Sequence, residues 1–331
     1  MVGMGLSARC KMNETNVIPP SQLERLLRYL GEIFPGKDVT AADIVRIGGM
    51  SNKNFRIGFE GKQYVFRLPG NGSEGMVDRA NEEYNARIGC RLGVNPAIRY
   101  FDRRTGVKLS DFMENAVTMD AETIQRPEIL LKVAAIYDRI HHAPEPLNNT
   151  FNLFEEIEKY DRLIRKNQAV MYPGWDGFKP YVMGLEQRLS RLGAELCPCH
   201  NDAVPENFIQ AADGTLYLID WEYSGMNDPM ADYAALFLES DFSEASREFF
   251  LNACYPDSRP PHAEERILCY EILWDTLWAQ WTVIKEACGD DFGDYGIHRF
   301  RRAPSRRPAP RSSQAHSPPM PWQPKQPPLQ M

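Results

Sequence analysis

The residues with the clearest chemical meaning lie between positions 200 and 220. His200 is followed by Asp202 and then by Asn207, and the apolar stretch Leu216–Asp220 reads as a strand that ends in a carboxylate. Phosphoryl transfer to a hydroxyl needs one carboxylate to take the proton, and an amide oxygen with a second carboxylate to hold Mg²⁺ against the phosphates. Asp202 fits the first role, Asn207 and Asp220 fit the second, and His200 would brace the loop.

Two other interpretations use the same residues. In the first, these residues form a solvated loop before an ordinary strand and carry no chemistry. The spacing of Asn207 and Asp220 along the sequence disfavours this interpretation. His200 could also bind a metal together with Cys197 and Cys199. However, one intervening residue is not the usual zinc spacing, and the sequence offers no fourth ligand. We therefore expect buried free thiols in a reducing cytoplasm.

A glycine-rich turn, Gly48–Phe55, lies between two expected strands. Backbone N–H groups in such a turn can approach phosphate oxygens closely. We therefore take Gly49, Ser51 and Asn52 as candidate nucleotide-binding residues, although Gly-Gly turns between strands are also common without any ligand.

Arg67 lies on an expected strand twelve residues after Phe55. A guanidinium can grip phosphate oxygens with two N–H groups at once. Protein kinases use a Lys at such a place, paired with a Glu on the next helix. Glu82 is the partner we expect here, with Glu83 as the alternative. The other alternative is that Arg67 and the Glu are ordinary surface residues without a function.

The elements that position these groups follow from hydrophobic periodicity. Residues 1–19 show no clear period, 20–114 form a sheet-rich half, and 115–298 form a larger helical half. The first half is expected to hold a helix with Leu23, Leu26, Leu27 and Leu30 on one face, strands at Ile44–Ile47, Phe55–Phe59, Tyr64–Leu68, Ala97–Phe101 and Val107–Phe112, and a helix at Val77–Leu92 with Val77, Ala80, Tyr84 and Ile88 on one face. The second half is expected to hold helices at Ile129–His142, Phe151–Gln168, Phe178–Leu192, Asp232–Phe242 and Ile267–Cys288, with a strand pair at Phe208–Gln210 and Leu216–Asp220. The pattern predicts an α+β protein, in which a small sheet with one main helix packed on it precedes a larger, mostly helical half.

Three tryptophans, Trp274, Trp278 and Trp281, are spaced by four and then three residues in one expected helix, so they share a face. Tyr223 follows Asp220 by three residues. A quaternary ammonium has no N–H to donate, so aromatic faces and nearby carboxylates must hold it, and a desolvated cation–π contact is worth about 2 kcal/mol. Packing in the core is the alternative for such a stripe, and it is what we expect for Trp274.

These motifs together resemble the bacterial choline kinases of the choline/ethanolamine kinase family, within the aminoglycoside-phosphotransferase-like kinases. The resemblance covers roughly residues 20–298, and its most specific part is the run Ile219-Asp-Trp-Glu-Tyr-Ser-Gly-Met-Asn-Asp-Pro229. It implies a bilobal protein-kinase-like fold that binds ATP and Mg²⁺ between the lobes and phosphorylates choline.

The resemblance also implies a role for individual residues. Asp202 would be the catalytic base, Asn207 and Asp220 the magnesium ligands, and Arg67 the phosphate clamp. Adenine would contact the backbone near Met113 and Glu114. Trp278 and Trp281 would hold the ammonium group with Tyr223, and the nearby carboxylates Glu222 and Asp228 would face the substrate. Asp228 and Asp232 could equally tie the Asn-Asp-Pro turn to the following helix.

Related substrates remain open on the same machinery. Ethanolamine, thiamine or an aminoglycoside could replace choline, and a non-catalytic pseudokinase scaffold is the alternative that is not an enzyme. The net charge of −7 argues weakly against a nucleic-acid partner and is compatible with a cationic substrate. No apolar run is long enough for a membrane span, no signal peptide is apparent, and the sequence gives no oligomeric state.

The C-terminal segment departs from the family pattern. Residues 299–331 are rich in Pro and Arg and contain no acid, so we expect a disordered tail there. The helix that closes the second lobe in the family would then be lost. A frame change or a genuine extension could produce this, and an inert extension is favoured over a nucleic-acid or membrane arm.

Overall fold

The computed structural model describes residues 18–48, 52–70 and 75–306. Its first lobe is built on a five-stranded antiparallel sheet in the order β1-β2-β3-β5-β4. The strands are β1 (Asp43–Gly48), β2 (Lys53–Phe59), β3 (Lys62–Leu68), β4 (Ile98–Phe101) and β5 (Lys108–Asp111). The expected strands are confirmed.

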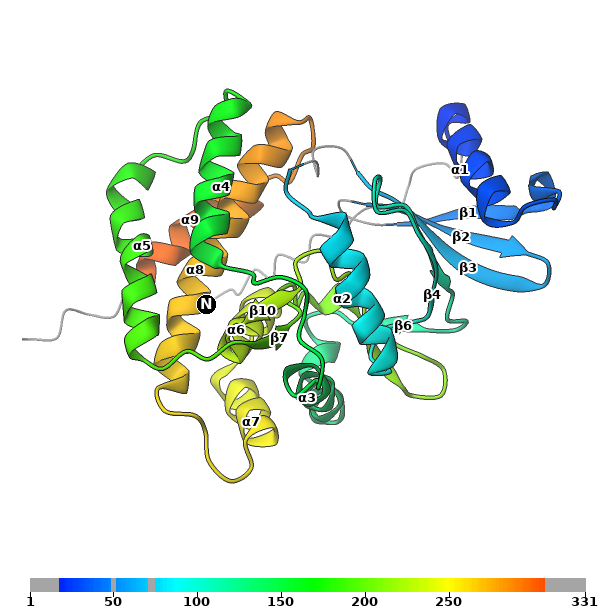
Figure 1. Ribbon diagram of the computed structural model, residues 1–331. Coiled ribbons are helices and arrows are strands. Elements are labelled where there is room, and N and C mark those ends of the chain that lie inside the picture. The colour runs from blue at the N-terminus through cyan, green and yellow to red at the C-terminus, as the bar shows by residue number, and fades with distance from the viewer. Residues whose placement is uncertain (1–17, 49–51, 71–74, 307–331) are drawn as a thin grey trace, which may run out of the picture.

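Helix α1 (Pro20–Ile33) covers one face of this sheet, as Figure 1 shows. Leu26, Tyr29 and Leu30 pack with Phe55 and Phe66 in a small core of their own. The expected helix is therefore confirmed, but its buried face is rotated, because Tyr29 is buried and Leu23 is exposed.

Helix α2 (Arg79–Arg91) lies between the sheet and the second lobe (Figure 1). Its buried residues include Glu82, Glu83 and Asn85, whereas Tyr84 is exposed. The expected apolar face through Tyr84 is wrong, because this helix buries polar side chains instead: Glu82 pairs with Arg67 of the sheet, and Asn85 donates to Ser224 of the second lobe. Gly89 allows this close approach, since a Cβ atom there would collide with the Trp221 ring.

The second lobe is mainly helical and holds the larger core. Its helices are α3 (Pro127–His141), α4 (Leu153–Lys166), α5 (Trp175–Arg191), α6 (Pro229–Glu239), α7 (Glu244–Cys254), α8 (Ala263–Ala287) and α9 (Tyr295–Ser305). Its short strands are β6 (Val117–Thr118), β7 (Cys197–Cys199), β8 (Phe208–Gln210), β9 (Leu216–Leu218) and β10 (Gly225–Asn227). They form the sheets β6-β8-β9 and β10-β7, and the two-lobed α+β architecture expected from the sequence is confirmed.

Helix α9 corrects the expectation of a tail that starts at Arg299. The helix runs through Ser305, and Arg299 and Arg302 both bind the buried carboxylate of Asp275 on α8. Arg299 also pairs with Glu239 at the end of α6. From the sequence we expect these arginines to be solvated, but in the structure each of them binds a carboxylate on a neighbouring helix. The rest of the expected tail, residues 307–331, lies outside the described residues.

Candidate active site

The loop after β7 brings the expected base and amide together. Asn207, at the end of a short 3₁₀ turn, donates from Nδ2 to the backbone oxygen of Asp202 at 2.9 Å and to its Oδ2 at 3.1 Å. This use of Nδ2 leaves the amide oxygen of Asn207 as its ligand atom. Asp202 itself is half-buried, so its carboxylate keeps a route to a bound molecule.

Asp220 reaches the same place through the strand that precedes it. The backbone N–H of Ile219 donates to the Asn207 carbonyl at 2.9 Å, and the Ile219 carbonyl lies 3.0 Å from Nε2 of His200. His200 is fully buried and thus joins the loop that carries Asp202 to the strand that ends at Asp220. This contact is compatible with the bracing role predicted for His200, and burial lowers the pKa of His200 to about 4, which keeps the ring neutral.

Two residues of the site have left-handed backbones. Asn201 has φ of 64° and Asp220 has φ of 67°, a conformation that is uncommon outside glycine. The backbone N–H of Asn201 donates to Asp232 Oδ1 at 2.6 Å, and that of His200 donates to Asp232 Oδ2 at 3.0 Å. The fully buried Asp232 therefore fixes the loop that carries Asp202, a use that the sequence did not suggest.

A cluster of charges joins the two lobes next to Asp220. Arg67 Nη2 lies 2.6 Å from Glu82 Oε1, so the expected pair forms, whereas Glu83 pairs with Arg87 and Arg103. Nη1 of Arg67 lies 3.2 Å from Asp220 Oδ1 and 3.0 Å from Glu222 Oε1.

Further contacts of this cluster come from residues that sequence reasoning missed. Arg79 Nη1 lies 2.7 Å from Glu82 Oε2 and 2.8 Å from Glu222 Oε1. Lys108 pairs across the sheet with Arg67 and lies 3.7 Å from Glu82. The three-residue interval from Arg79 to Glu82 was the available sequence signal, because it places both on one face of a helix.

The carboxylates of Asp202 and Asp220 lie close enough to repel each other. Burial raises the pKa of Asp202 well above its usual range, and the carboxylates of Asp220 and Glu239 raise it further. Burial also raises the pKa of Asp220, as does the Glu222 carboxylate. A divalent cation relieves such repulsion, and carboxylate and amide oxygens are the ligands that Mg²⁺ prefers. Asn207 and Asp220 therefore fit a magnesium ion.

An aromatic cluster stands beside this site. The Tyr223 ring meets Trp278 edge-on with centroids 5.1 Å apart, and Trp278 meets Trp281 edge-on at 6.2 Å. Trp274 stacks on Phe151 and donates its indole N–H to a backbone carbonyl, so it belongs to the core as expected. Burial raises the pKa of Tyr223, and the Tyr160 hydroxyl and the Glu222 and Asp202 carboxylates add to the effect, so the cluster adjoins Asp202.

Two residues expected to contact the substrate, Glu222 and Asp228, form ion pairs within the fold. Glu222 Oε1 accepts from Asn52 Nδ2 at 2.9 Å as well as from Arg67 and Arg79, so this carboxylate belongs to the charge cluster between the lobes. Asp228 is fully buried, caps α6 and holds Arg266 with both oxygens. Asp228 therefore does not face the acceptor, because Arg266 binds both of its oxygens. Glu222 is engaged through Oε1, and its expected contact with the acceptor stays a prediction.

Glu239 is a carboxylate that sequence reasoning missed. It ends α6, pairs with Arg299 of α9 and adds to the raised pKa of Asp202. Arg299 also donates to the Tyr295 hydroxyl at 2.9 Å. These contacts were hidden because the sequence was interpreted as losing α9.

For the other residues expected to bind the nucleotide, the structure gives at most their location, burial and contacts. Gly49 and Ser51 lie outside the described residues. Asn52 is buried at the start of the hairpin, where it contacts Glu222. Met113 is half-buried and Glu114 is exposed, both in the segment between β5 and β6 that links the lobes.

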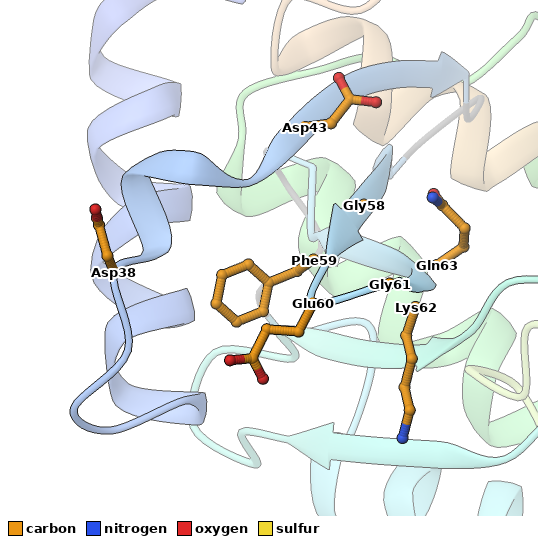
Figure 2. A pocket seen from close by; sticks show the side chains of 8 residues that line it. All are labelled: Asp38, Asp43, Gly58, Phe59, Glu60, Gly61, Lys62 and Gln63. Atoms are coloured by element: carbon orange, nitrogen blue, oxygen red, sulfur yellow. The ribbon is translucent and has the colours of Figure 1, made fainter.

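A hollow of about 430 Å³ lies elsewhere in the first lobe, lined by residues that include Asp43, Phe59 and Lys62 (Figure 2). It sits at the turn end of the β2–β3 hairpin, where Phe59 pairs with Lys62, whereas the opposite end of the hairpin carries Arg67 and Asn52. None of the candidate catalytic residues lines it. This hollow is therefore not the nucleotide site.

Comparison with known proteins adds to the geometry. The sequence profile described as Choline/ethanolamine kinase matches residues 44–267. Protein LicA of Haemophilus influenzae is 30% identical over 262 residues, which cover 77% of this chain and 97% of that protein.

Solved structures give the same picture. The crystal structure of choline kinase LicA from Streptococcus pneumoniae is 38% identical and aligns with a TM-score of 0.78, covering 86% of this chain and 98% of that one. A crystal structure of LicA in complex with AMP is also 38% identical, with a TM-score of 0.76 over 86% of this chain and 96% of that one. The expected kinase-like fold is thus confirmed. Within the part of the chain that the structure describes, no helix is both long and apolar enough to cross a membrane.

Proposed function

The chain belongs to the choline/ethanolamine kinase family, and from this premise we propose that it transfers the terminal phosphoryl group of ATP to the hydroxyl of choline. Membership makes it a phosphotransferase with an alcohol as acceptor, and such enzymes use ATP and Mg²⁺. The observation that carries the proposal is the meeting of Asp202, Asn207 and Asp220 beside an aromatic cluster.

Asp202 acts as the base in this proposal. When bound, ATP supplies the phosphoryl group and Mg²⁺ neutralises the charge on it. The raised pKa of Asp202 suits a group that must take a proton from a hydroxyl, and the Asn207 amide holds its carboxylate in one orientation. Asn207 and Asp220 are the residues that would hold the metal, and His200 positions the loop.

Arg67 and Asn52 serve the phosphates from the first lobe. Glu82 and Glu222 hold the Arg67 guanidinium at a fixed place, so little order is lost when it binds an anion. In the same proposal Gly49 and Ser51 are nucleotide-binding residues, and Met113 and Glu114 lie at the adenine. The lobe boundary at residue 114 follows from this assignment.

The acceptor is held by aromatic faces. Tyr223, Trp278 and Trp281 are nearly buried, so a trimethylammonium group among them would lose its water and gain about 2 kcal/mol or more from a cation–π contact. Glu239 supplies negative charge close to Asp202. An unmethylated ammonium would need hydrogen-bond acceptors, which aromatic faces do not offer, and this favours choline over ethanolamine.

A graded set of acceptors tests the proposal. ADP release is measured with choline, dimethylethanolamine, methylethanolamine and ethanolamine, with thiamine and an aminoglycoside as more distant alcohols. We expect kcat/KM to fall as each methyl group is removed. Ethanolamine as the best acceptor would refute the aromatic argument, and no Mg²⁺-dependent turnover with any acceptor would favour a non-catalytic scaffold.

The setting of the enzyme follows from its chemistry. We place it in the cytoplasm, because the described cysteines are all free thiols. The small cationic alcohol is the partner in this proposal, and no nucleic acid is involved.

A further inference from the structure

Two cysteines and a histidine meet on the far side of the strand that enters the catalytic loop. Cys197 and Cys199 flank Pro198 on β7, and strand geometry puts their side chains on one face. His141 ends α3, which packs against β7. A ring nitrogen of His141 and the two Sγ atoms all lie within 4.8 Å of one another.

The spacing of the sulfurs suits a metal. The two Sγ atoms are 3.7 Å apart. Two thiolates bound to tetrahedral zinc at about 2.3 Å each are separated by about 3.8 Å, which follows from the bond length and the tetrahedral angle. The one-residue interval that argued against zinc in the sequence thus places both sulfurs at a suitable separation.

One ring nitrogen of the histidine is held by a carboxylate. Its Nε2 lies 2.9 Å from Asp232 Oδ2, and this bond fixes the ring and leaves Nδ1 for a cation. Within the described part of the chain, the hydrogen-bond contact of Nδ1 is a long one, 3.4 Å from the Tyr233 hydroxyl. Ligating histidines commonly give their other ring N–H to a carboxylate in this way. The sequence pointed to His200 as the third ligand, but the His200 ring faces Ile219 instead.

We propose that Cys197, Cys199 and His141 bind one soft divalent cation, with Zn²⁺ as the fitting ion. Two thiolates and a neutral imidazole balance its charge. The half-buried side of Cys197 gives an entry path and a place for a water or another ligand at the fourth position. This site is distinct from the oxygen-rich site at Asn207 and Asp220, which suits Mg²⁺.

The bound ion would brace the catalytic loop. It ties α3 to β7, and β7 leads directly into His200 and Asp202. Asp232, which orients His141, also accepts the backbone N–H groups of His200 and Asn201. The site is therefore a structural one that acts on the loop through Asp232.

Metal content of the full chain tests the proposal without any assay of turnover. We expect about one zinc per chain after purification in a reducing, chelator-free buffer. Exchange with Co²⁺ should give a thiolate-to-cobalt absorption band. Cys197→Ser removes a half-buried ligand with little change in packing and should abolish the zinc and the band. Cys288→Ser, at an exposed cysteine outside the site, should leave both unchanged.

Three results would overturn it. These are a chain that neither contains zinc nor binds Co²⁺ with a thiolate band, a band that survives in Cys197→Ser, or mass spectrometry that finds Cys197 and Cys199 joined as a disulfide in the reduced preparation. Far-ultraviolet circular dichroism of Cys197→Ser shows whether the variant is folded. An unfolded variant is replaced by His141→Gln, which should lose the zinc while both thiols remain.

Discussion

Glu222→Gln tests whether the charge cluster holds the two lobes together. Glu222 lies on the second lobe, and its Oε1 accepts hydrogen bonds from Asn52, Arg67 and Arg79 on the first lobe. Burial alone would raise the pKa of Glu222, but the two guanidinium groups hold it below its usual range, so the side chain is ionised at neutral pH. The substitution keeps the shape and one acceptor oxygen, removes the charge and replaces the other oxygen with an NH₂ group.

The expected loss can be worked out from these contacts. A hydrogen bond to a charged group contributes about 1 kcal/mol more than a neutral one. Two guanidinium contacts therefore predict a loss of about 2 kcal/mol in the free energy of unfolding. Because Arg67 and Asn52 lose their anchor, KM for ATP should rise by about tenfold, the equivalent of about 1.4 kcal/mol, while KM for choline changes little.

Urea unfolding without nucleotide measures the first effect, and steady-state kinetics measure the second. Glu145→Gln is the matched control, because Glu145 also holds an Arg and a hydroxyl but is exposed. Such a surface pair should change the free energy of unfolding by less than about 1 kcal/mol. If Glu222→Gln is no more destabilising than this control, the cluster does not join the lobes as described.

Three further predictions concern the acceptor, the brace and α9. Trp278→Leu should raise KM for choline by about 30-fold, the equivalent of about 2 kcal/mol, with KM for ATP unchanged; equal KM values for choline in variant and wild type would contradict the aromatic site. His200 should show no ring titration by NMR between about pH 5.5 and 8, because burial lowers its pKa to about 4. The unfolded chain then binds the extra proton, so the contribution of His200 to stability is complete above about pH 6.5 and falls toward pH 4; a ring that titrates near 6.5 would contradict its burial. Asp275→Asn should reduce the free energy of unfolding by about 3 kcal/mol, because it leaves Arg299 and Arg302 short of a buried countercharge, and a chemical unfolding curve like that of wild type would show that α9 is not anchored by this carboxylate.

The sequence predicted the parts of the site that depend on local spacing. Asp202 and Asn207 are five residues apart in one loop, and Asp220 ends a short apolar strand, so their proximity could be predicted from their order along the chain. The strand carrying Arg67 and the helix carrying Glu82 were also recognisable from period and turn signals.

The errors concern charges whose partners are distant in sequence. Asp228 was predicted to be a substrate carboxylate, but it binds Arg266. Arg299 was predicted to lie in a solvated tail, but it binds Asp275 and Glu239. His141 lies far from Cys197 along the chain, and no motif links the two residues. Hydrophobic periodicity finds apolar faces, but it does not show which buried charges will meet, because that depends on how the helices pack.

Turnover by Asp202→Ala is the most direct test of the central claim, that this carboxylate takes the proton of the acceptor while Asn207 and Asp220 serve the metal. Phosphocholine formation and ATP affinity are measured on the same preparation, with Mg²⁺ present. We predict that kcat falls by at least about 100-fold while the Kd for ATP stays within a few-fold of wild type. A variant that keeps kcat within about tenfold of wild type would contradict the assignment of Asp202 as the base.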